Sequence, residues 1–446
     1  MLADQGRTAA LVRTCALRGQ AAKGRPLVVT LVAAALGTLA GCAPAPPPTT
    51  RCERHVRPAV GLAARCGAGP PKFQLTKVAV QADEVRRQEA IVDVDGDGRE
   101  EVFILRRRQN YEVWRWAVGP GLVKMESGVL EPGAGALSKE YALLGVGDLN
   151  GDGRADLLLR AFANWFEEFR IWIRSKEMGY GPGIGSFVLN NRKESLHGGR
   201  QHLADFDCDG RVDLGGLHST ERLWLRVWHG DGSGAFPRFT DTAWEGDYTF
   251  NLPASELLGD LNGDGNPDLL ALHDVSKGRG RISMYFGSVL GRFQRAIRVA
   301  AEPEWNAVTA ADLDGDGRDE VVGVRLWEAT EGGWNWRPGE VAVFSGEDGS
   351  LREQRKIGDL GGEPLLAGRF SCPGRIDLLL GNGLLVRTDE AGHLSAPIEL
   401  TPKLEGAQRV VDLNGDGLDD LLGVWWDRRD PQSTSHFYLW INQTPQ

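Results

Sequence analysis

The sequence contains none of the common motifs of a catalytic or nucleotide-binding site. It has no G-x-S-x-G nucleophile elbow, no HExxH helix and no glycine-rich loop followed by Lys-Ser or Lys-Thr. Histidine is also scarce, with eight residues in 446. The middle of the chain holds His197, His202, His218, His229 and His273, which we interpret as isolated polar positions on strands. No catalytic residue is therefore assigned, and a binding role is favoured over enzymatic activity.

No apolar run in the N-terminal region is long enough for a comfortable membrane span. The run LVVTLVAAALGTL (27–39) follows a basic segment and leads into LAGC, which ends at Cys42. This order is typical of a secretory signal, and LAGC resembles the lipobox of bacterial lipoproteins, in which the cysteine is lipidated. We expect a lipoprotein signal peptide over 1–41 and a protein exported and lipid-anchored through Cys42, at the cell surface or the periplasmic face of a bacterial membrane. A plain secretory signal is the alternative.

Cysteine is rare, with six residues in the chain. Residues 42–72 include APAPPPTT, an extended proline-rich tether that cannot pack into a core. Cys52 and Cys66 lie in this tether, and in an exported protein their spacing would allow a disulfide. Cys208 and Cys372 lie farther along the chain, and the sequence does not assign the pairing of the four.

The sequence has no excess of basic residues, since 51 Lys and Arg stand against 61 Asp and Glu, for a net charge of −10. Twenty-one of the acidic residues occupy possible metal-ligand positions in six loops. Six bound divalent ions would bring the net charge to about +2. The acidity therefore says little about partners, and a nucleic-acid partner gains no support.

Glycine is abundant, with 59 residues, and much of it lies in one recurring acidic loop of nine residues. The loop begins with Asp at 93, 148, 205, 260, 312 and 412, as in DVDGDGREE (93–101) and DLNGDGRAD (148–156). The spacing is 52 to 57 residues until the last interval of 100, which is about twice as long. The repeat length is that of a blade of a β-propeller.

A degenerate loop fills the long interval. RFSCPGRID (369–377) keeps Gly374 and Asp377, but Arg369, Ser371 and Pro373 replace the first three ligand positions. We interpret it as a seventh repeat whose metal site is lost, with a basic side chain in the place of the cation.

Short apolar runs before and after each loop are typical of buried strands, and a third and a weaker fourth strand follow. Four strands per repeat predict an all-β, seven-bladed β-propeller with the acidic loops as inner hairpins. The last repeat has only three clear strands, whereas KFQLTKVAVQ precedes the first repeat unpaired. We expect 73–81 to close the ring as the outer strand of the last blade. The blades are expected near 88–135, 140–195, 198–250, 255–303, 306–360, 363–403 and 405–446.

The loops are expected to bind calcium, which takes six to eight oxygen ligands from side chains at positions 1, 3 and 5 and a backbone carbonyl at position 7. An acid at position 9 closes the site. The expected ligands are Asp93, Asp95, Asp97, Arg99 and Glu101; Asp148, Asn150, Asp152, Arg154 and Asp156; Asp205, Asp207, Asp209, Arg211 and Asp213; Asp260, Asn262, Asp264, Asn266 and Asp268; Asp312, Asp314, Asp316, Arg318 and Glu320; and Asp412, Asn414, Asp416, Leu418 and Asp420. In each set the fourth residue acts through its carbonyl.

Other metal-loop types fit less well. An EF-hand needs a bidentate acid at position 12 on a helix, but that position holds Ile104, Leu159 or a small residue within apolar strand sequence. Magnesium is disfavoured because it keeps its waters, whereas these loops offer many protein oxygens. The sites are therefore expected to be structural and to stiffen each hairpin.

The repeats resemble the FG-GAP/VCBS family, known from integrin alpha-chain heads and many bacterial secreted proteins. Besides the D-x-[DN]-G-D-G-x-x-[DE] loops, the chain has similar glycine-rich turns after the third strand in WHGDGSGAF (228–236), YFGSVLGRF (285–293) and VFSGEDGSL (343–351). The resemblance covers about 73–446. It implies a seven-bladed propeller with one calcium in each intact repeat, about six ions, and a binding role. Cys208 replaces the usual glycine at position 4 without removing a ligand.

The connections opposite the acidic loops are rich in tryptophan, which suits a sugar or peptide ligand. The candidate ligand-binding residues are Trp165, Trp244, Trp305, Trp334, Trp336 and Trp425. Alternatively, individual indoles fill the wedges between blades. We expect a non-catalytic module that binds a glycan or a protein in the cell envelope. A carbohydrate-active lyase or glycoside hydrolase on the same scaffold, and a purely architectural envelope lipoprotein, are the alternatives.

Overall fold

The computed structural model describes the chain from residue 70, at the end of the expected tether, and all described residues belong to one unit, Thr50–Gln446. They are 70–80, 88–117, 121–163, 166–177, 179–190, 195–196, 201–220, 222–244, 255–273, 280–294, 296–299, 305–330, 333–358, 365–381, 383–400, 404, 407–426 and 435–444. The expected signal peptide, Cys42, Cys52, Cys66, Trp165 and His197 lie outside them. Within these residues no helix is long and apolar enough to cross a membrane.

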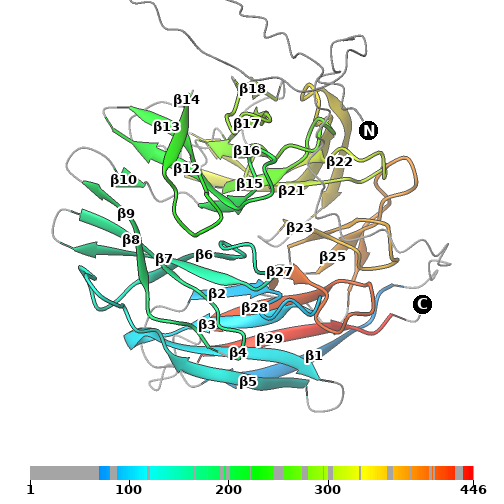
Figure 1. The fold of residues 1–446 in the computed structure, drawn as a ribbon. Coiled ribbons are helices and arrows are strands. Elements are labelled where there is room, and N and C mark those ends of the chain that lie inside the picture. The colour runs from blue at the N-terminus through cyan, green and yellow to red at the C-terminus, as the bar shows by residue number, and fades with distance from the viewer. Residues whose placement is uncertain are drawn as a thin grey trace, which may run out of the picture. The chain divides into compact units, whose positions relative to one another are not determined.

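The described strands form seven antiparallel sheets, each of which is one blade of a propeller (Figure 1). Blades 1 to 3 contain β2 (Gln88–Val92), β3 (Glu101–Leu105), β4 (Asn110–Ala117) and β5 (Gly121–Val129); β6 (Ala142–Gly147), β7 (Asp156–Ala163), β8 (Phe166–Trp172) and β9 (Ile184–Asn190); and β10 (Ser195–Leu196), β11 (His202–Ala204), β12 (Asp213–Ser219), β13 (Leu223–His229) and β14 (Arg238–Ala243). A 3-10 turn, η1 (Arg107–Gln109), joins β3 and β4.

The remaining four blades follow the same order. They contain β15 (Ser255–Gly259), β16 (Asp268–His273), β17 (Arg281–Tyr285) and β18 (Ile297–Arg298); β19 (Ala307–Ala311), β20 (Glu320–Thr330), β21 (Gly333–Phe344) and β22 (Leu351–Gly358); β23 (Leu365–Gly368), β24 (Asp377–Leu380), β25 (Leu384–Val386) and β26 (Ile398–Glu399); and β27 (Ala407–Val411), β28 (Asp420–Trp426) and β29 (Ser435–Asn442) with β1 (Phe73–Val80).

The burial of each strand follows its place in the blade. The second strands are covered on both faces, so β3 and β16 are buried at every position and read as continuous apolar runs. Outer strands carry polar side chains, and β22, with the sequence LREQRKIG, is mostly exposed. The acidic loops join the first and second strands, which places them all at the same end of the blades.

Seven apolar clusters join neighbouring blades and complete a ring. The cluster of Leu270, Ile282 and Phe344 joins blades 4 and 5, and the cluster of Ile104, Leu422 and Leu439 joins blades 7 and 1. The other five clusters join the remaining neighbours in order. Each blade therefore buries both faces against its neighbours, which is why no single repeat could fold alone.

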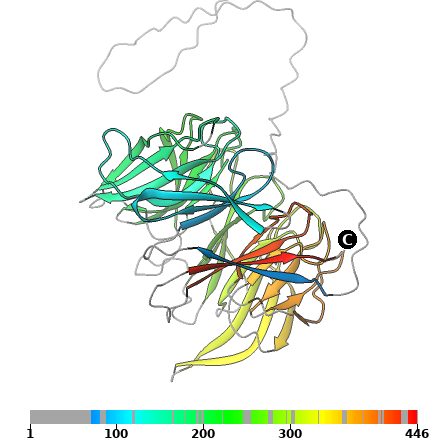
Figure 2. The same ribbon diagram turned by 90° about the horizontal axis from the view of Figure 1, so that it is seen from below.

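The first and last strands of the described chain lie side by side. All eight residues of β1 pair with β29, from Phe73 opposite Asn442 to Val80 opposite Ser435. Figures 1 and 2 show this pairing as a blue strand beside a red one. Because β1 covers the outer edge of β29, the chain closes its ring with non-covalent hydrogen bonds between its two ends.

The inner strands are crowded, as the small residues before each loop predict. A Cβ atom on Gly259, the last residue of β15, would lie 2.7 Å from Oδ2 of Asp319 and 3.5 Å from Cβ of Ala310 in the next blade. Blade 3 departs from the expected boundaries, since both β10 and β11 pair with β12 and β10 begins before residue 198.

Candidate metal centre

The aspartate at position 1 organises the backbone of each acidic loop. In loop 1, Asp93 Oδ1 accepts hydrogen bonds from the amides of Gly96 and Asp97 at 2.8 and 3.1 Å, and Oδ2 accepts one from Gly98 at 2.7 Å. The same bonds from positions 4 to 6 recur, in whole or in part, in the other five intact loops. The turn is thus fixed by a side chain that still has lone pairs for a cation.

Glycine at position 6 allows the backbone to adopt the left-handed conformation that this turn requires. Gly98 has a φ of 86°, and the equivalent glycines lie between 81° and 88°. Position 4 is also left-handed, and Cys208 adopts a φ of 58° where the other intact loops have glycine. Loop 3 therefore keeps the shape of its neighbours at the expense of backbone strain in a non-glycine residue.

The acid at position 9 lies at the buried base of the loop. Asp268 Oδ2 accepts a hydrogen bond from the amide of Leu261 at 2.8 Å, and Oδ1 accepts one from Gly287, after the third strand, at 2.7 Å. Glu101, Asp156, Asp213, Glu320 and Asp420 likewise accept an amide at position 2 of their own loop. All six are at most 3% exposed.

Burial raises the pKa of five of these closing carboxyls. Desolvation, opposed by the backbone hydrogen bonds and reinforced by the neighbouring loop aspartates, raises the pKa of Asp268 and Asp420 to about 7 and that of Asp156 to about 6. Burial likewise raises the pKa of Glu320 to about 7, and that of Glu101 above its usual value. A bound cation would remove this penalty, because it supplies the charge that the interior lacks.

Three loops have aspartate at position 3, and in each an arginine contacts it. Arg115, from β4, reaches Asp95, Asp97 and Glu101 at 2.9, 3.0 and 2.6 Å. In loop 5, Arg352 contacts Asp314 at 2.9 Å and also Glu320. In loop 3, Arg238 contacts Asp207 at 2.9 Å.

The other three loops have asparagine at position 3. Asn150 Nδ2 donates to Asp152 at 3.2 Å and its Oδ1 accepts the Asp152 amide at 3.0 Å. Asn262 and Asn414 make the same pair of contacts with Asp264 and Asp416. The amide thus holds the carboxylate at position 5 toward the centre of the loop.

The residues present fit calcium by donor chemistry, since clustered carboxylate oxygens are the ligands it prefers. Ligand oxygens of Asp93, Asp95 and Glu101 lie within 4.8 Å of one another, as do those of Asp312, Asp314 and Asp316 and those of Asp205, Asp207 and Asp209. These groups contain positions 1, 3 and 5 or 9, which the sequence pattern predicts as ligands.

A further side chain, which the sequence did not predict as a metal ligand, lies beside loop 3. His229, the last residue of β13, is 1% exposed, and its Nδ1 lies 3.1 Å from Asp207 and 3.7 Å from Asp213. From the sequence it was expected to be an isolated polar position on a strand. An alignment of the glycine-rich turns could have identified it. His229 immediately precedes the first glycine of WHGDGSGAF, and the equivalent residue of repeat 4 is the apolar Phe286.

The degenerate loop of blade 6 keeps its buried acid and replaces the rest. Asp377 accepts the amide of Ser371, at position 3, at 2.9 Å, whereas the closing acids of the intact loops accept the amide at position 2. Arg369 turns away from its own loop and pairs with Asp419 of blade 7 at 2.9 Å. The basic side chain near Asp377 is instead Arg387, whose Nε donates to Ser371 Oγ at 3.0 Å. Arg369 therefore does not take the place of a cation in its own loop.

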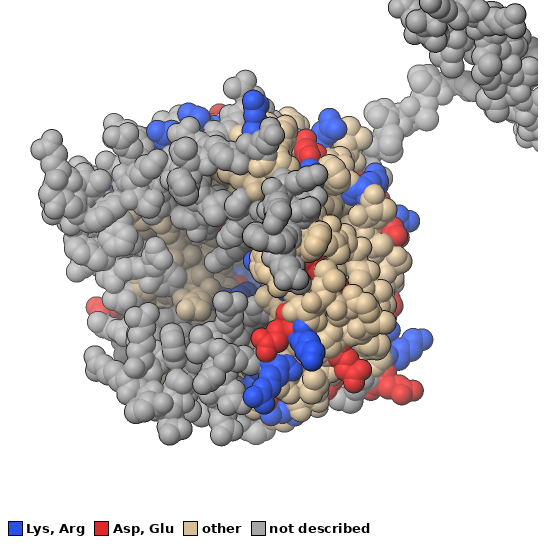
Figure 3. Space-filling model, turned by 90° about the vertical axis from the view of Figure 1, so that its left-hand side faces the viewer, with Lys and Arg blue, Asp and Glu red and all other residues tan. Residues whose placement is uncertain are grey.

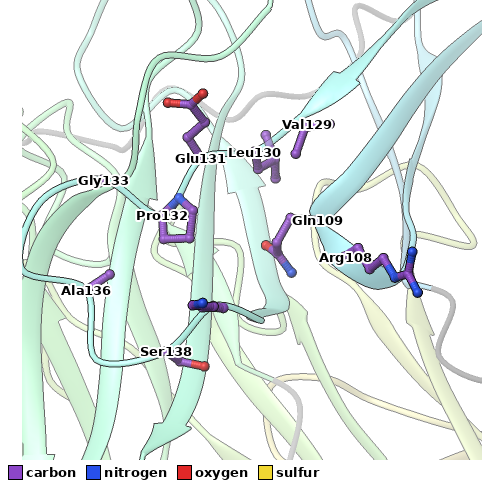
Figure 4. A pocket seen from close by; sticks show the side chains of 10 residues that line it. Arg108, Gln109, Val129, Leu130, Glu131, Pro132, Gly133, Ala136 and Ser138 are labelled. Carbon is purple, nitrogen blue, oxygen red and sulfur yellow. The ribbon is translucent and has the colours of Figure 1, made fainter.

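A pocket of about 440 Å³ opens at the opposite end of blades 1 and 2 from the acidic loops (Figure 4). Its lining comes from η1 and from the connection between β5 and β6, and includes Arg108, Gln109, Ser138 and Lys139. Arg108 and Gln109 both have left-handed backbones, with φ of 57° and 61°. Two backbone hydrogen bonds hold this turn. The amide of Arg106 donates to the carbonyl of Asn110 at 2.7 Å, and the amide of Leu130 donates to the carbonyl of Gln109 at 2.8 Å.

Two of the candidate ligand-binding tryptophans are core residues, so that part of the prediction was wrong. Trp244 is 7% exposed and stacks on Tyr285 with ring centroids 5.1 Å apart. Trp305 is 2% exposed, meets Phe344 edge to face at 5.4 Å and lies under the guanidinium of Arg325. Both fill wedges between blades, where the space widens outward and needs bulk.

The other tryptophans remain candidates by position alone. Trp334 and Trp336 lie on β21, opposite Ala329 and Trp327 on β20, and Trp425 lies on β28 opposite His436. Their side chains are outside the described set. The hairpin of β20 and β21, shown in yellow in Figure 2, extends beyond the part of its blade that pairs with β19 and β22.

Cys208 and Cys372, which occupy the acidic loop of blade 3 and the degenerate loop of blade 6, are both disulfide-bonded. The sequence left their pairing open.

On the side of the molecule drawn in Figure 3, basic and acidic side chains of the described residues are interspersed. That side offers a charged partner no area of a single sign among them.

Comparisons with known proteins identify the repeats. A family model described as FG-GAP-like repeat matches residues 93–159 and 260–323, which contain the first, second, fourth and fifth acidic loops. The resemblance inferred from the loop motif is thereby confirmed: the chain is a seven-bladed β-propeller that carries FG-GAP-like repeats. No curated protein is significantly similar to it in sequence.

Solved structures similar to the chain share little sequence with it. They include the Tc holotoxin pore of Photorhabdus luminescens (15% identity, TM-score 0.41, covering 83% of this chain and 14% of that one) and a BBS1N fragment in complex with ARL6DN (13%, 0.43, covering 80% and 91%). Raptor of Chaetomium thermophilum matches at 11% identity with a TM-score of 0.44, covering 84% of this chain and 29% of that one. The chain thus spans a small part of the first of these proteins, and the similarities carry no inference about function.

Proposed function

We propose that the chain is an exported, lipid-anchored and calcium-stabilised propeller that acts as a non-catalytic binding module for a glycan or protein in the cell envelope. The observation that carries the proposal is that the two ends of the blades present different features. One end holds the acidic loops, and the other holds the pocket and the long β20–β21 hairpin. A propeller whose two ends differ in this way is consistent with a binding module.

Calcium is the part of the proposal that the loop geometry supports. Each intact loop gathers three or four acids around a turn fixed by position 1, and the closing acid is buried, with a raised pKa in five of the six loops. Without a cation these carboxylates repel one another and resist ionisation. About six calcium ions would neutralise them and couple the inner hairpin of each blade to its third strand.

The pocket supports a ligand that carries an acidic group. Arg108 and Lys139 contribute two positive charges to its lining, against the one negative charge of Glu131. Gln109 Nε2 donates to the carbonyl of Tyr141 at 3.0 Å, which holds the amide in the wall. Two consecutive left-handed residues other than glycine are strained, and strain of this kind concentrates at binding sites. An anionic cell-wall glycan, or an acidic segment of a protein, has the complementary charge.

Anchoring is supported by the sequence alone, through the lipobox-like LAGC and the proline-rich tether. Metabolic labelling with a palmitate analogue would test it, since Cys42→Ser should abolish the label. Labelling that persists in this variant would exclude Cys42 as the anchor.

The binding proposal is tested by charge reversal at the pocket. The full chain with Arg108→Glu and Lys139→Glu would be compared with wild type for binding to purified anionic cell-wall glycans, and to the same envelope fraction after protease treatment. We expect at least a tenfold loss of affinity with an unchanged melting temperature, since each rim charge contributes on the order of 1 kcal/mol or more. The matched control is Arg292→Glu, which lies in an exposed turn at the same end of the blades as the acidic loops, away from the pocket.

Equal affinity of wild type and pocket variant would refute the pocket as the binding site. Trp334→Ala with Trp336→Ala, in the same assay, tests the long hairpin separately. Binding that survives protease treatment of the envelope fraction indicates a glycan partner, and binding that disappears indicates a protein.

A further inference from the structure

We infer that the loop of the third repeat holds a first-row transition-metal dication, such as Zn²⁺ or Mn²⁺, in preference to calcium. His229 adds a buried nitrogen ligand to the carboxylates of Asp207 and Asp213. The inference rests on the proposed function only in taking the loops as metal sites. It makes repeat 3 chemically different from the other five intact repeats.

The three candidate ligand atoms have the separations of ligands on a single small ion. His229 Nδ1 lies 3.1 Å from Asp207 Oδ2 and 3.7 Å from Asp213 Oδ2. Two atoms each about 2.1 Å from one ion lie about 3.0 Å apart at a right angle and about 3.4 Å apart at the tetrahedral angle. His229 and Asp213 are 1% and 0% exposed, so the site is formed on rigid, buried positions of β13 and β12.

The hydrogen bonds around the imidazole leave Nδ1 as an acceptor. The hydroxyl of Thr240 donates to the carbonyl of Gly291, which can only accept. Thr240 Oγ1 must then accept from His229 Nε2, 3.2 Å away, so the proton of the neutral ring is on Nε2. Nδ1 therefore points a lone pair at two carboxylates and makes no hydrogen bond of acceptable geometry. A neutral ring and two carboxylates thus present three acceptors to one another, and either a second proton on the ring or a metal ion between them would supply the positive charge that they need.

The ring is also held rigidly in place. A Cβ atom on Gly291, which has a φ of 61°, would lie 2.1 Å from His229 Cε1, so the backbone of the neighbouring turn packs directly against the imidazole. An outer hydrogen bond that fixes the tautomer and orientation of a histidine is the usual arrangement around metal-bound imidazole. Asp207 Oδ1, on the other side of the site, is buried and also lacks a hydrogen bond.

The donor set selects the class of metal. Calcium prefers oxygen ligands, whereas imidazole suits zinc, manganese and related ions. The equivalent position is Phe286 in repeat 4 and Ser345 in repeat 5. Arg238, which contacts Asp207 at 2.9 Å, is a competing cation, but 62% of its side chain is exposed and it reaches the site from outside.

The test uses the full chain, stripped with a chelator and then saturated with calcium. Titration with Co²⁺, whose visible absorption reports nitrogen coordination, should show one equivalent bound despite the excess of calcium. In His229→Phe, which places the residue of repeat 4 at this position, we expect the affinity for Co²⁺ to fall by about 100-fold or more, and in Thr240→Val by about 10- to 100-fold. The calcium content of the remaining loops should not change.

Controls separate this inference from the proposed function. His393→Phe, an exposed histidine paired with Asp389 in a surface turn, should bind Co²⁺ as wild type does. Melting temperatures show whether each variant is folded. The inference is overturned if calcium displaces Co²⁺ from wild type, or if His229→Phe binds Co²⁺ equally well. Failure of every loop to bind calcium would instead refute the proposed function and leave the Co²⁺ result to stand by itself.

Discussion

Removal of calcium should reverse the pH dependence of the propeller's stability. In the metal-free protein, Asp268, Glu320 and Asp420 have pKa values of about 7, well above their ordinary values of 3.8 to 4.5. A carboxyl whose pKa is raised in the folded state binds its proton more tightly when folded than when unfolded. Its protonation therefore stabilises the fold, and this contribution is lost as the pH rises through the folded pKa.

The size of the effect follows from these values. Between pH 6 and pH 8 a folded carboxyl with a pKa of about 7 holds on average about half a proton, while the unfolded chain is ionised throughout. Each such group therefore removes about 1.4 kcal/mol of stability over this range. The three groups together remove about 4 kcal/mol, or about 5 °C in melting temperature for a domain of this size.

The assay is differential scanning calorimetry of the full chain at pH 6 and pH 8, with excess calcium and with excess chelator. The chelated protein should melt about 5 °C lower at pH 8 than at pH 6. The calcium-loaded protein should show the opposite trend, because protons compete with calcium for the same oxygens. If the two curves run parallel across this range, the closing carboxyls are not metal ligands.

Three further predictions follow from particular contacts. Arg115→Gln should destabilise the chelated protein, because Arg115 neutralises three carboxylates, yet raise the calcium affinity of loop 1 by about tenfold or more, as measured by calorimetric titration; an unchanged affinity would show that Arg115 does not compete with the ion. Trp305→Ala should lower the free energy of unfolding by about 3–5 kcal/mol in denaturant melts without affecting ligand binding, and a selective loss of binding would contradict its core position. Gly259→Val should cost about 1–3 kcal/mol of unfolding free energy in the same melts, because its side chain would overlap Asp319. Gly259 does not have a left-handed φ, so this cost reports the overlap, whereas Gly135→Val, with open space around its Cβ and a φ of 71°, reports backbone strain without overlap.

The sequence predicts the fold well because the repeat is strictly local. A blade is made of consecutive antiparallel strands, so loop spacing and short apolar runs suffice to count blades and to order their strands. The pairing of β1 with β29 involves the two ends of the described chain, yet it also follows from local arithmetic. One repeat is a strand short and one strand is left over.

What the sequence could not predict depends on contacts between strands and between blades. The arginines that contact the aspartate at position 3 come from β4, β14 and β22. The first of these is the third strand of its blade, and the other two are fourth strands. No fixed spacing from the loop identifies them. The contact of His229 with the loop likewise depends on the register of β13, which the sequence does not give. Whether Trp244 and Trp305 fill a wedge between blades or lie on the surface depends on the position of the neighbouring blade.

The contacts at position 3 explain how two kinds of loop can serve one purpose. In loops with asparagine, the side-chain amide itself donates to the carboxylate at position 5. In loops with aspartate this donor is missing and a fourth negative charge is added, and in all three an arginine from elsewhere in the blade supplies both a donor and a compensating charge. The two solutions leave a similar net charge for a cation to neutralise. They should differ in kinetics, however, because a guanidinium must move before an ion can enter, whereas an amide need only keep its place.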